Sequence, residues 1–186
     1  HIWNQGEGAG STDDNIYLRI DSTGVLYFGW GRTGALNECR IGSLGTTINT
    51  SHWHGVYIAH TGERLSGSDA TAANLADCFD IRRMGSNDAP AFSTISANLS
   101  TSANWTSGST GGRMDRSYTG DFSIGGRGTN RNFHGKIASM VVTTLRIGQT
   151  MPDTTEVEKL LTDPAGWLTD YKVGSAFRRT DEAAPS

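Results

Sequence analysis

Residues that could support hydrolysis are few and unsuitably spaced. A glycosidase needs two carboxylates at a fixed separation on one strand face, one protonated and one ionised. The nearest pair, Asp77 and Asp80, is three residues apart, so an extended strand would turn the two side chains to opposite faces. The sequence Gly-x-Ser-x-Gly, which presents a nucleophilic serine on a sharp turn, is absent from the chain. We therefore expect no enzymatic activity.

Two histidines have a spacing that could suit a metal ion. His52 and His54 are two residues apart on an expected strand, so both imidazoles would share one face. They could bind Zn²⁺ if a third ligand, such as His60 or Asp80, arrives from elsewhere. We favour the alternative, a pair of solvated histidines at a strand end, and expect no metal.

Aromatic side chains with polar neighbours are better suited to binding. Sugars stack their C–H faces on aromatic rings, and nearby polar side chains reach the hydroxyls. Trp105 stands among Ser, Thr and Asn, so we expect it to be the exposed ligand aromatic, whereas Trp53 lies in a strong strand pattern and is expected in the core. Tyr57 is a further possible platform. The candidate carbohydrate-binding residues are Trp30, Trp53, His54, Asn104, Trp105 and Arg127.

The composition favours a scaffold made of strands. The chain has 24 glycines and only 35% apolar residues, which is typical of many short strands joined by many turns. Residues 15–20 and 25–30 alternate or are rich in β-branched and aromatic residues, and the turn residues between them predict a hairpin. Further strands are expected at 37–41, 52–59, 78–84, 122–124 and 133–145.

The remaining segments divide into loops and a helical end. Residues 66–76 are small and polar and predict a loop, and residues 85–117 predict one or two weak strands with long loops. After Pro152, the spacing of Asp153 and Glu156 is that of a capping box, and Pro164 can open a second short helix. We expect domain boundaries at 1–150, 151–174 (helices packed on the strands) and 175–186 (a polar tail or linker).

Charge and hydropathy exclude two classes of partner. The net charge is −3 and the arginines are scattered, so the basic stripe of a nucleic-acid-binding protein is missing. No apolar run approaches the roughly 20 residues that a membrane span needs. The chain begins at His1 rather than Met, which suggests a processed product or a piece of a longer polypeptide. Cys39 and Cys78 are expected to be buried free thiols.

Three segments together resemble a known family. Phe122–Gly126 followed by Phe133–Ile137 and Val141–Val142 is similar to the closing strands of laminin-G-like and pentraxin-like domains, which belong to the concanavalin A-like lectin/glucanase superfamily. Trp53–Ile58 resembles a core strand of that family, and 15–28 its early hairpin. The resemblance covers roughly residues 12–148, and its middle third matches poorly.

The resemblance implies an all-β fold, a two-sheet antiparallel jelly-roll sandwich with a short C-terminal two-helix extension. The family's glucanases carry a Glu-x-Asp-x-Glu strand, which this chain lacks. Many related domains hold Ca²⁺ through loop oxygens, so calcium stays open as an alternative to no cofactor. The oxygen ligands available for it would be Asp13, Asp14, Asp69, Asp77, Asn87 and Asp88.

The helical end resembles tails that follow such domains in tailed-bacteriophage proteins. This implies a virion or extracellular protein that binds a glycan or a host surface receptor, on a tail fibre or a similar appendage. The alternative is a capsid or tail decoration protein whose partners are other virion proteins. A homo-oligomer would fit either role, with a trimer expected for a fibre.

Overall fold

A computed structural model describes nine segments of the chain, and it divides the chain into two compact units, residues 1–136 and 137–186. Each unit is treated by itself below. Predictions that fall on other residues lie outside the described part, among them those for His52, Arg127 and the polar tail. The described segments are 2–6, 15–32, 35–41, 53–61, 71–85, 95–106, 122–126, 133–142 and 151–167.

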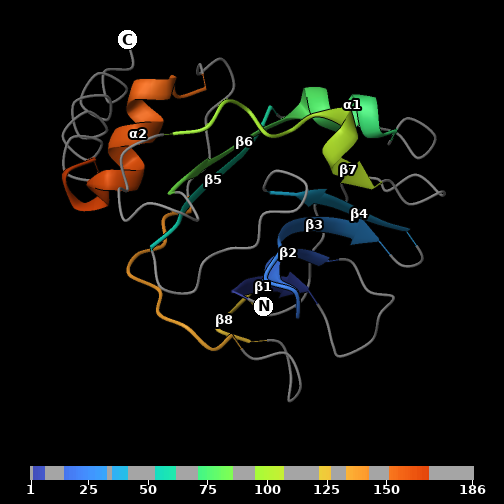
Figure 1. Cartoon of the computed structure of the whole chain (residues 1–186), viewed down its shortest axis with the longest axis horizontal. Coiled ribbons are helices and arrows are strands. Elements are labelled where there is room, and N and C mark those ends of the chain that lie inside the picture. The colour runs from blue at the N-terminus through green and yellow to red at the C-terminus, as the bar shows by residue number, and fades with distance from the viewer. Residues whose placement is uncertain are drawn as a thin grey trace, which may run out of the picture. The chain divides into compact units, whose positions relative to one another are not determined.

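A six-stranded antiparallel sheet is the larger of the two sheets in the first unit (Figure 1). Its strand order is β7-β4-β3-β2-β1-β8, so strands that are close in sequence are neighbours in its centre. With the second sheet described below, it confirms the expected mostly-β antiparallel architecture. The strands are β1 (Trp3–Gly6), β2 (Asn15–Ile20), β3 (Leu26–Arg32), β4 (Ala35–Arg40), β7 (Trp105–Thr106) and β8 (Phe122–Ile124).

The predicted hairpin at 15–30 is confirmed as β2 and β3. Its turn is held by the Asp21 carboxylate, whose Oδ1 accepts from the Thr23 and Val25 backbone N–H groups at 2.8 and 3.0 Å. Burial acts to raise the pKa of Asp21, but a hydrogen bond from the Thr23 hydroxyl at 2.7 Å, together with these two backbone bonds, outweighs it and lowers the pKa. Gly24 has a φ of 82°, which an L side chain rarely adopts. The turn chemistry therefore fixes the register of the hairpin.

A second, two-stranded sheet pairs β5 (Gly55–His60) with β6 (Phe79–Met84). Residues 95–100 run along the other edge of β6 and are tied to it both by backbone hydrogen bonds from Ser96 and Leu99 and by side chains. The Asn98 amide accepts from Ile81 N at 2.9 Å and donates to Phe79 O at 3.1 Å, in the manner of a backbone amide. This explains how a segment with little strand propensity still satisfies the edge of β6.

The predicted loop at 66–76 is wrong for its C-terminal part, because helix α1 covers Ala72–Cys78. Residues 66–70 lie outside the described part. The Thr71 hydroxyl caps the helix by accepting from Asn74 N at 3.3 Å, and Leu75 and Cys78 form its buried side. One buried stripe and one cap are enough for a helix of two turns that packs on a core. The sequence did not predict this helix because most of its residues are small or polar.

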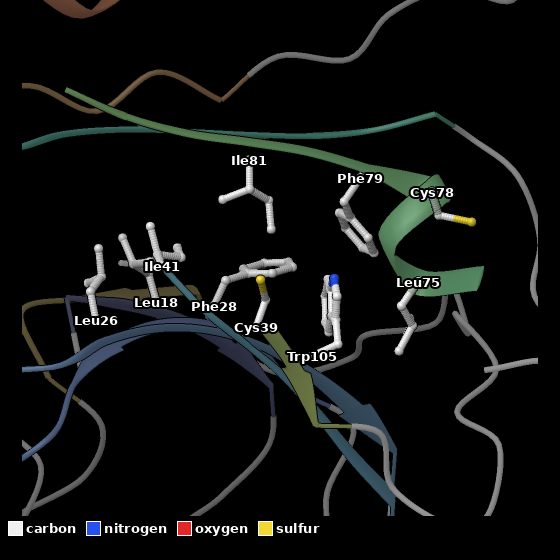
Figure 2. Close-up of a cluster of buried hydrophobic side chains, with 10 residues drawn as sticks. All are labelled: Leu18, Leu26, Phe28, Cys39, Ile41, Leu75, Cys78, Phe79, Ile81 and Trp105. Carbon is white, nitrogen blue, oxygen red and sulfur yellow. The ribbon is translucent and has the colours of Figure 1, made fainter. Parts of the chain in front are cut away.

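The core lies between the six-stranded sheet and the layer formed by β6 and α1 (Figure 2). Phe28 is at its centre, with its ring 5.3 Å from that of Phe79 and 6.2 Å from that of Trp105. Both contacts are edge-to-face, the arrangement that the ring quadrupoles favour. The buried cluster consists of Leu18, Leu26, Phe28, Cys39, Ile41, Leu75, Cys78, Phe79, Ile81 and Trp105.

Both cysteines are buried free thiols, as predicted. Cys39 is on β4 and Cys78 ends α1, so the two come from different layers of the core. Burial raises the pKa of the Cys39 thiol to about 12. A thiol with so high a pKa is almost entirely protonated at neutral pH, so Cys39 acts as a small apolar core residue.

His60 couples the stability of the first unit to pH. Its ring packs edge-on against Phe79 at 4.8 Å, and burial lowers its pKa below the ordinary value of about 6.5. As the pH falls below about 6.5, the unfolded chain binds a proton that the folded chain resists, so stability must fall. We expect urea unfolding to show lower stability at pH 5.5 than at pH 7.5, and His60→Gln to reduce that difference.

The control for the pH effect is His134→Gln, because His134 is exposed. It should keep the stability difference between pH 5.5 and pH 7.5. An unchanged difference in the His60 variant would show that another group is responsible. Carboxylates titrate mainly below this window, so they interfere little.

The predicted strand at 133–145 is wrong for its described part. Residues 133–142 are in neither helix nor strand, and Val142 is 75% exposed. A run of β-branched residues forms a strand only where a neighbouring strand completes its ladder. Here Phe133 N donates to Gly125 O at 2.8 Å. Residues 143–145 lie outside the described part.

The second unit contains helix α2 (Thr154–Thr162), as predicted. Its capping box is formed by Asp153 and Glu156: Glu156 N donates to Asp153 Oδ1 at 2.9 Å, and Asp153 N to Glu156 Oε2 at 3.3 Å. Val157 is its buried residue. A further helical turn covers residues 164–167, where a second helix was expected. The packing of these helices on the strands stays a prediction.

Candidate functional site: the polar face of the six-stranded sheet

The six-stranded sheet carries polar side chains on the side opposite its core. Because neighbouring residues of a strand point to opposite faces, the core positions Leu18, Phe28 and Cys39 place their neighbours on this second face. The register aligns these neighbours in two rows across the sheet. The first row runs through Asn4, Tyr17 and Glu38, and the second runs through Arg19, Tyr27 and Arg40. We call the following set the polar face: Asn4, Tyr17, Arg19, Tyr27, Glu38, Arg40, Thr106 and Ser123.

A hydrogen-bonded network on β2 and β4 spans the centre of the polar face. The Tyr17 hydroxyl donates to Glu38 Oε1 at 2.7 Å, and Arg19 approaches the same oxygen with Nε at 2.9 Å and Nη2 at 2.7 Å. All three contacts are to Oε1. No described residue bonds Oε2.

Gly29 makes the network possible. It pairs with both Tyr17 and Glu38 on the strand between them, and the Tyr17 ring lies directly over it. A Cβ at position 29 would be 2.0 Å from Tyr17 Cζ. A residue without a side chain therefore lets the tyrosine reach across β3 to the carboxylate on β4.

The ionisation of the network follows from its burial. Burial, followed by the hydrogen bond to Glu38, raises the pKa of Tyr17 well above its usual value. Burial acts to lower the pKa of Arg19, but the contact with Glu38 outweighs it and raises the pKa. Tyr17 is thus a neutral donor and Arg19 a fixed cation at neutral pH.

A second row contains Arg19, Tyr27 and Arg40 on β2, β3 and β4. Arg19 Cζ lies 4.6 Å from the centre of the Tyr27 ring, a cation–π contact that holds both side chains. Arg40 Nε is buried without a hydrogen-bond partner among the described residues. Asn4 Oδ1, on the first row, is also buried without a hydrogen-bond partner among the described residues.

The polar face offers binding chemistry. It combines a half-buried aromatic ring, fixed guanidinium donors, and carboxylate and amide acceptors, which are the groups that recognise hydroxyls and anions. Glu38 is the single carboxylate of the face as defined, so the face does not provide the acid and base pair of a glycosidase.

Two of the three tryptophans of the predicted site, Trp53 and Trp105, have the reverse of the exposure expected for them. Trp105 was expected to be exposed, which is wrong: it is 6% exposed, belongs to the core, and its Nε1 donates to Ser100 Oγ at 3.1 Å. Trp53 was expected in the core, which is also wrong, because it is 55% exposed at the start of β5. Neighbouring polar residues indicated solvent at Trp105, but its strand pairing with Cys39 turns it inward.

Of the other predicted site residues, the structure describes the side chains of Asn104 and His54. Asn104 Nδ2 donates to Leu99 O at 2.8 Å and has a structural role. His54 adjoins Trp53 and packs near Gly85, whose φ of 103° and short approach to the Trp53 carbonyl leave no room for a Cβ. Trp30 is on β3, but its side chain and Arg127 lie outside the described part.

No metal-binding cluster of three or more His, Cys, Asp or Glu residues occurs within the described segments. Asp80, considered as a third zinc ligand, pairs with Arg82 at 2.9 Å instead. Asp77 is an exposed residue of α1, and the other proposed calcium ligands lie outside the described segments.

Sequence reasoning did not identify the polar face as a site. Tyr17 and Arg19 were visible as the polar side of an alternating strand, but this is the default for any half-buried strand. Glu38 and Arg40 are about twenty residues further along the chain. The closest signal was Gly29, a glycine inside a strand pattern, which often marks a close approach.

Comparisons with known proteins give no further identification. No family model, no curated protein and no solved structure matches the chain. Among the helices that the described segments contain, none is long and apolar enough to cross a membrane.

Proposed function

We propose that this chain is a non-catalytic module that binds carbohydrate or a glycosylated host receptor, built as a concanavalin A-like jelly-roll sandwich. The observation that carries the proposal is the polar face. Its Tyr17–Glu38–Arg19 network is fixed by contacts of 2.7–2.9 Å, and free acceptor and donor atoms remain beside it. Rigid polar groups around an aromatic ring lose little entropy when they bind a sugar.

The sandwich is supported by the packing of the first unit. One face of the six-stranded sheet shares its core with Phe79 and Ile81 of β6, which is the packing that a sandwich of two sheets requires. The polar face is then the outer side of the larger layer. The location on a phage tail fibre or similar virion appendage follows from the resemblance of the helical end alone.

A structural decoration role is the second candidate, and β8 favours it. Phe122 and Ile124 are 46% and 56% exposed on an outer strand of the sheet. Apolar side chains on an outer strand are typical of contacts with another protein. In that case the chain would bind other virion proteins and no glycan.

A glycan array with the whole chain tests the binding function. We expect retention of at least one glycan and its loss, by about tenfold or more, in Tyr27→Ala, because this change removes the ring on which Arg19 is stacked. Trp53→Ala is the comparison, since Trp53 is an exposed aromatic residue just before β5, outside the six-stranded sheet.

The two variants separate three outcomes. Loss in Tyr27→Ala alone places the ligand on the polar face. Loss in Trp53→Ala alone moves the ligand to the start of β5 and contradicts the polar-face site. An array on which the folded chain binds nothing contradicts the glycan-binding function and favours decoration.

A further inference from the structure

We propose that the ligand of the polar face is an acidic glycan whose carboxylate or sulfate group binds the Arg40 guanidinium. This ligand class rests on the proposed function, because it requires that the face binds glycan. Three properties of Arg40 support it: its unbalanced charge, its unbonded Nε, and its place beside Tyr27.

The charge of Arg40 is not balanced by any described carboxylate. Arg19 and Glu38 form a close pair, so their charges cancel. The charge of Asp21 interacts with Arg19, and the Asp21 Oδ1 accepts hydrogen bonds from the backbone of the turn. Counted over the polar face as defined, Arg19 and Arg40 are positive and Glu38 is negative, so one positive charge remains there, although the chain as a whole has a net charge of −3. An acidic polymer is repelled by most of such a protein and attracted to this place.

The planar guanidinium of Arg40 suits a two-oxygen acceptor. A buried N–H without a partner is costly, and a guanidinium bonds a carboxylate or sulfate through two parallel N–H groups at once. A sugar hydroxyl satisfies one of them. Arg83 also has an unbonded nitrogen, but it alternates with Arg82 on β6 and shares the core-side face of Ile81.

The position of Arg40 places its guanidinium beside an aromatic ring that could contact a sugar. It is the direct cross-strand neighbour of Tyr27, and Arg19 is the neighbour on the other side. Side chains that are directly opposite on antiparallel strands have Cβ atoms about 5 Å apart, so a sugar bound beside Tyr27 lies within reach of both arginines. Arg19 is held by Glu38, which leaves Arg40 for the acidic group.

The test measures binding of four polysaccharides to the whole chain by affinity electrophoresis and calorimetry. Alginate supplies carboxylates, dextran sulfate supplies sulfates, and laminarin and dextran are neutral. We expect alginate or dextran sulfate to bind and the neutral polymers not to bind. Arg40→Gln should weaken binding roughly tenfold or more, because it removes a charge-assisted contact. Arg40→Lys, which keeps the charge but not the two-pronged geometry, should fall between.

The matched control is Arg82→Gln. It removes the same single charge from another strand, where Arg82 is paired with Asp80 at 2.9 Å. Unchanged binding in this variant, with loss in Arg40→Gln, supports the proposal, and the preferred polymer shows which acidic group is recognised. Equal losses in the two variants would show unspecific charge attraction and overturn it.

The failure of the acidic ligand and the failure of the binding function give different results. If laminarin or dextran binds as well as the acidic polymers, and Arg40→Gln leaves this unchanged, the acidic ligand is overturned while glycan binding stands. If the folded chain binds none of the four polymers and nothing on the array, both are overturned.

Discussion

Replacing Phe28 with alanine is expected to lower the free energy of unfolding by about 3–5 kcal/mol, the usual cost of removing a large aromatic side chain from a core. Phe28 is 1% exposed and contacts Phe79 and Trp105. Its loss leaves a cavity between the six-stranded sheet and β6. Domains of this kind are stable by about 5–15 kcal/mol, so much of the total stability depends on this side chain.

Urea unfolding followed by tryptophan fluorescence measures the effect of Phe28→Ala. Phe122→Ala is the matched control, because the same side chain is removed from a position that is 46% exposed. We expect the control to cost less than about 1 kcal/mol. Similar losses in both variants would contradict a core that is centred on Phe28. If Phe28→Ala does not fold, Phe28→Leu, which keeps much of the volume, should show a smaller loss in the same direction.

The parts of the fold that were predictable depend on local chemistry. The hairpin of β2 and β3 follows from alternation and from the turn at Asp21, and α2 follows from its capping box. Each of these signals is contained within a few consecutive residues. The predictions that were wrong depend on contacts between distant parts of the chain. Residues 133–142 have the composition of a strand, but the sequence does not show whether a neighbouring strand is present.

The same reason explains the two tryptophans. Alternation shows that the two sides of a strand differ, but it does not show which side another layer covers. The polar neighbours of Trp105 predict that it is exposed. It pairs instead with Cys39, more than sixty residues earlier in the chain, and this pairing places it in the core. Trp53 precedes β5 rather than lying in it, so the alternation of strand faces does not determine where its side chain lies.

Gly29→Ala is expected to be the most disruptive small change on the polar face. The new methyl group would be 2.0 Å from Tyr17 Cζ and 2.3 Å from its hydroxyl oxygen, so the ring must leave its place. A ring is not a flexible chain end, and its displacement also breaks the hydrogen bond to Glu38. We expect a loss of about 2–4 kcal/mol, from overpacking and the broken hydrogen bond together. Urea unfolding measures it, and glycan binding should fall in parallel.

A double-mutant cycle isolates the cause of that loss. In a Tyr17→Ala background the space above Gly29 is empty, so Gly29→Ala should cost less than about 0.5 kcal/mol or even stabilise the strand, because alanine restricts the unfolded chain more than glycine does. The interaction between the two changes is then almost the whole effect of Gly29→Ala. An equal cost in both backgrounds would mean that the Tyr17 ring does not cross β3 at this point. The network that links Tyr17 to Glu38, and with it the geometry of the polar face, would then have to be abandoned.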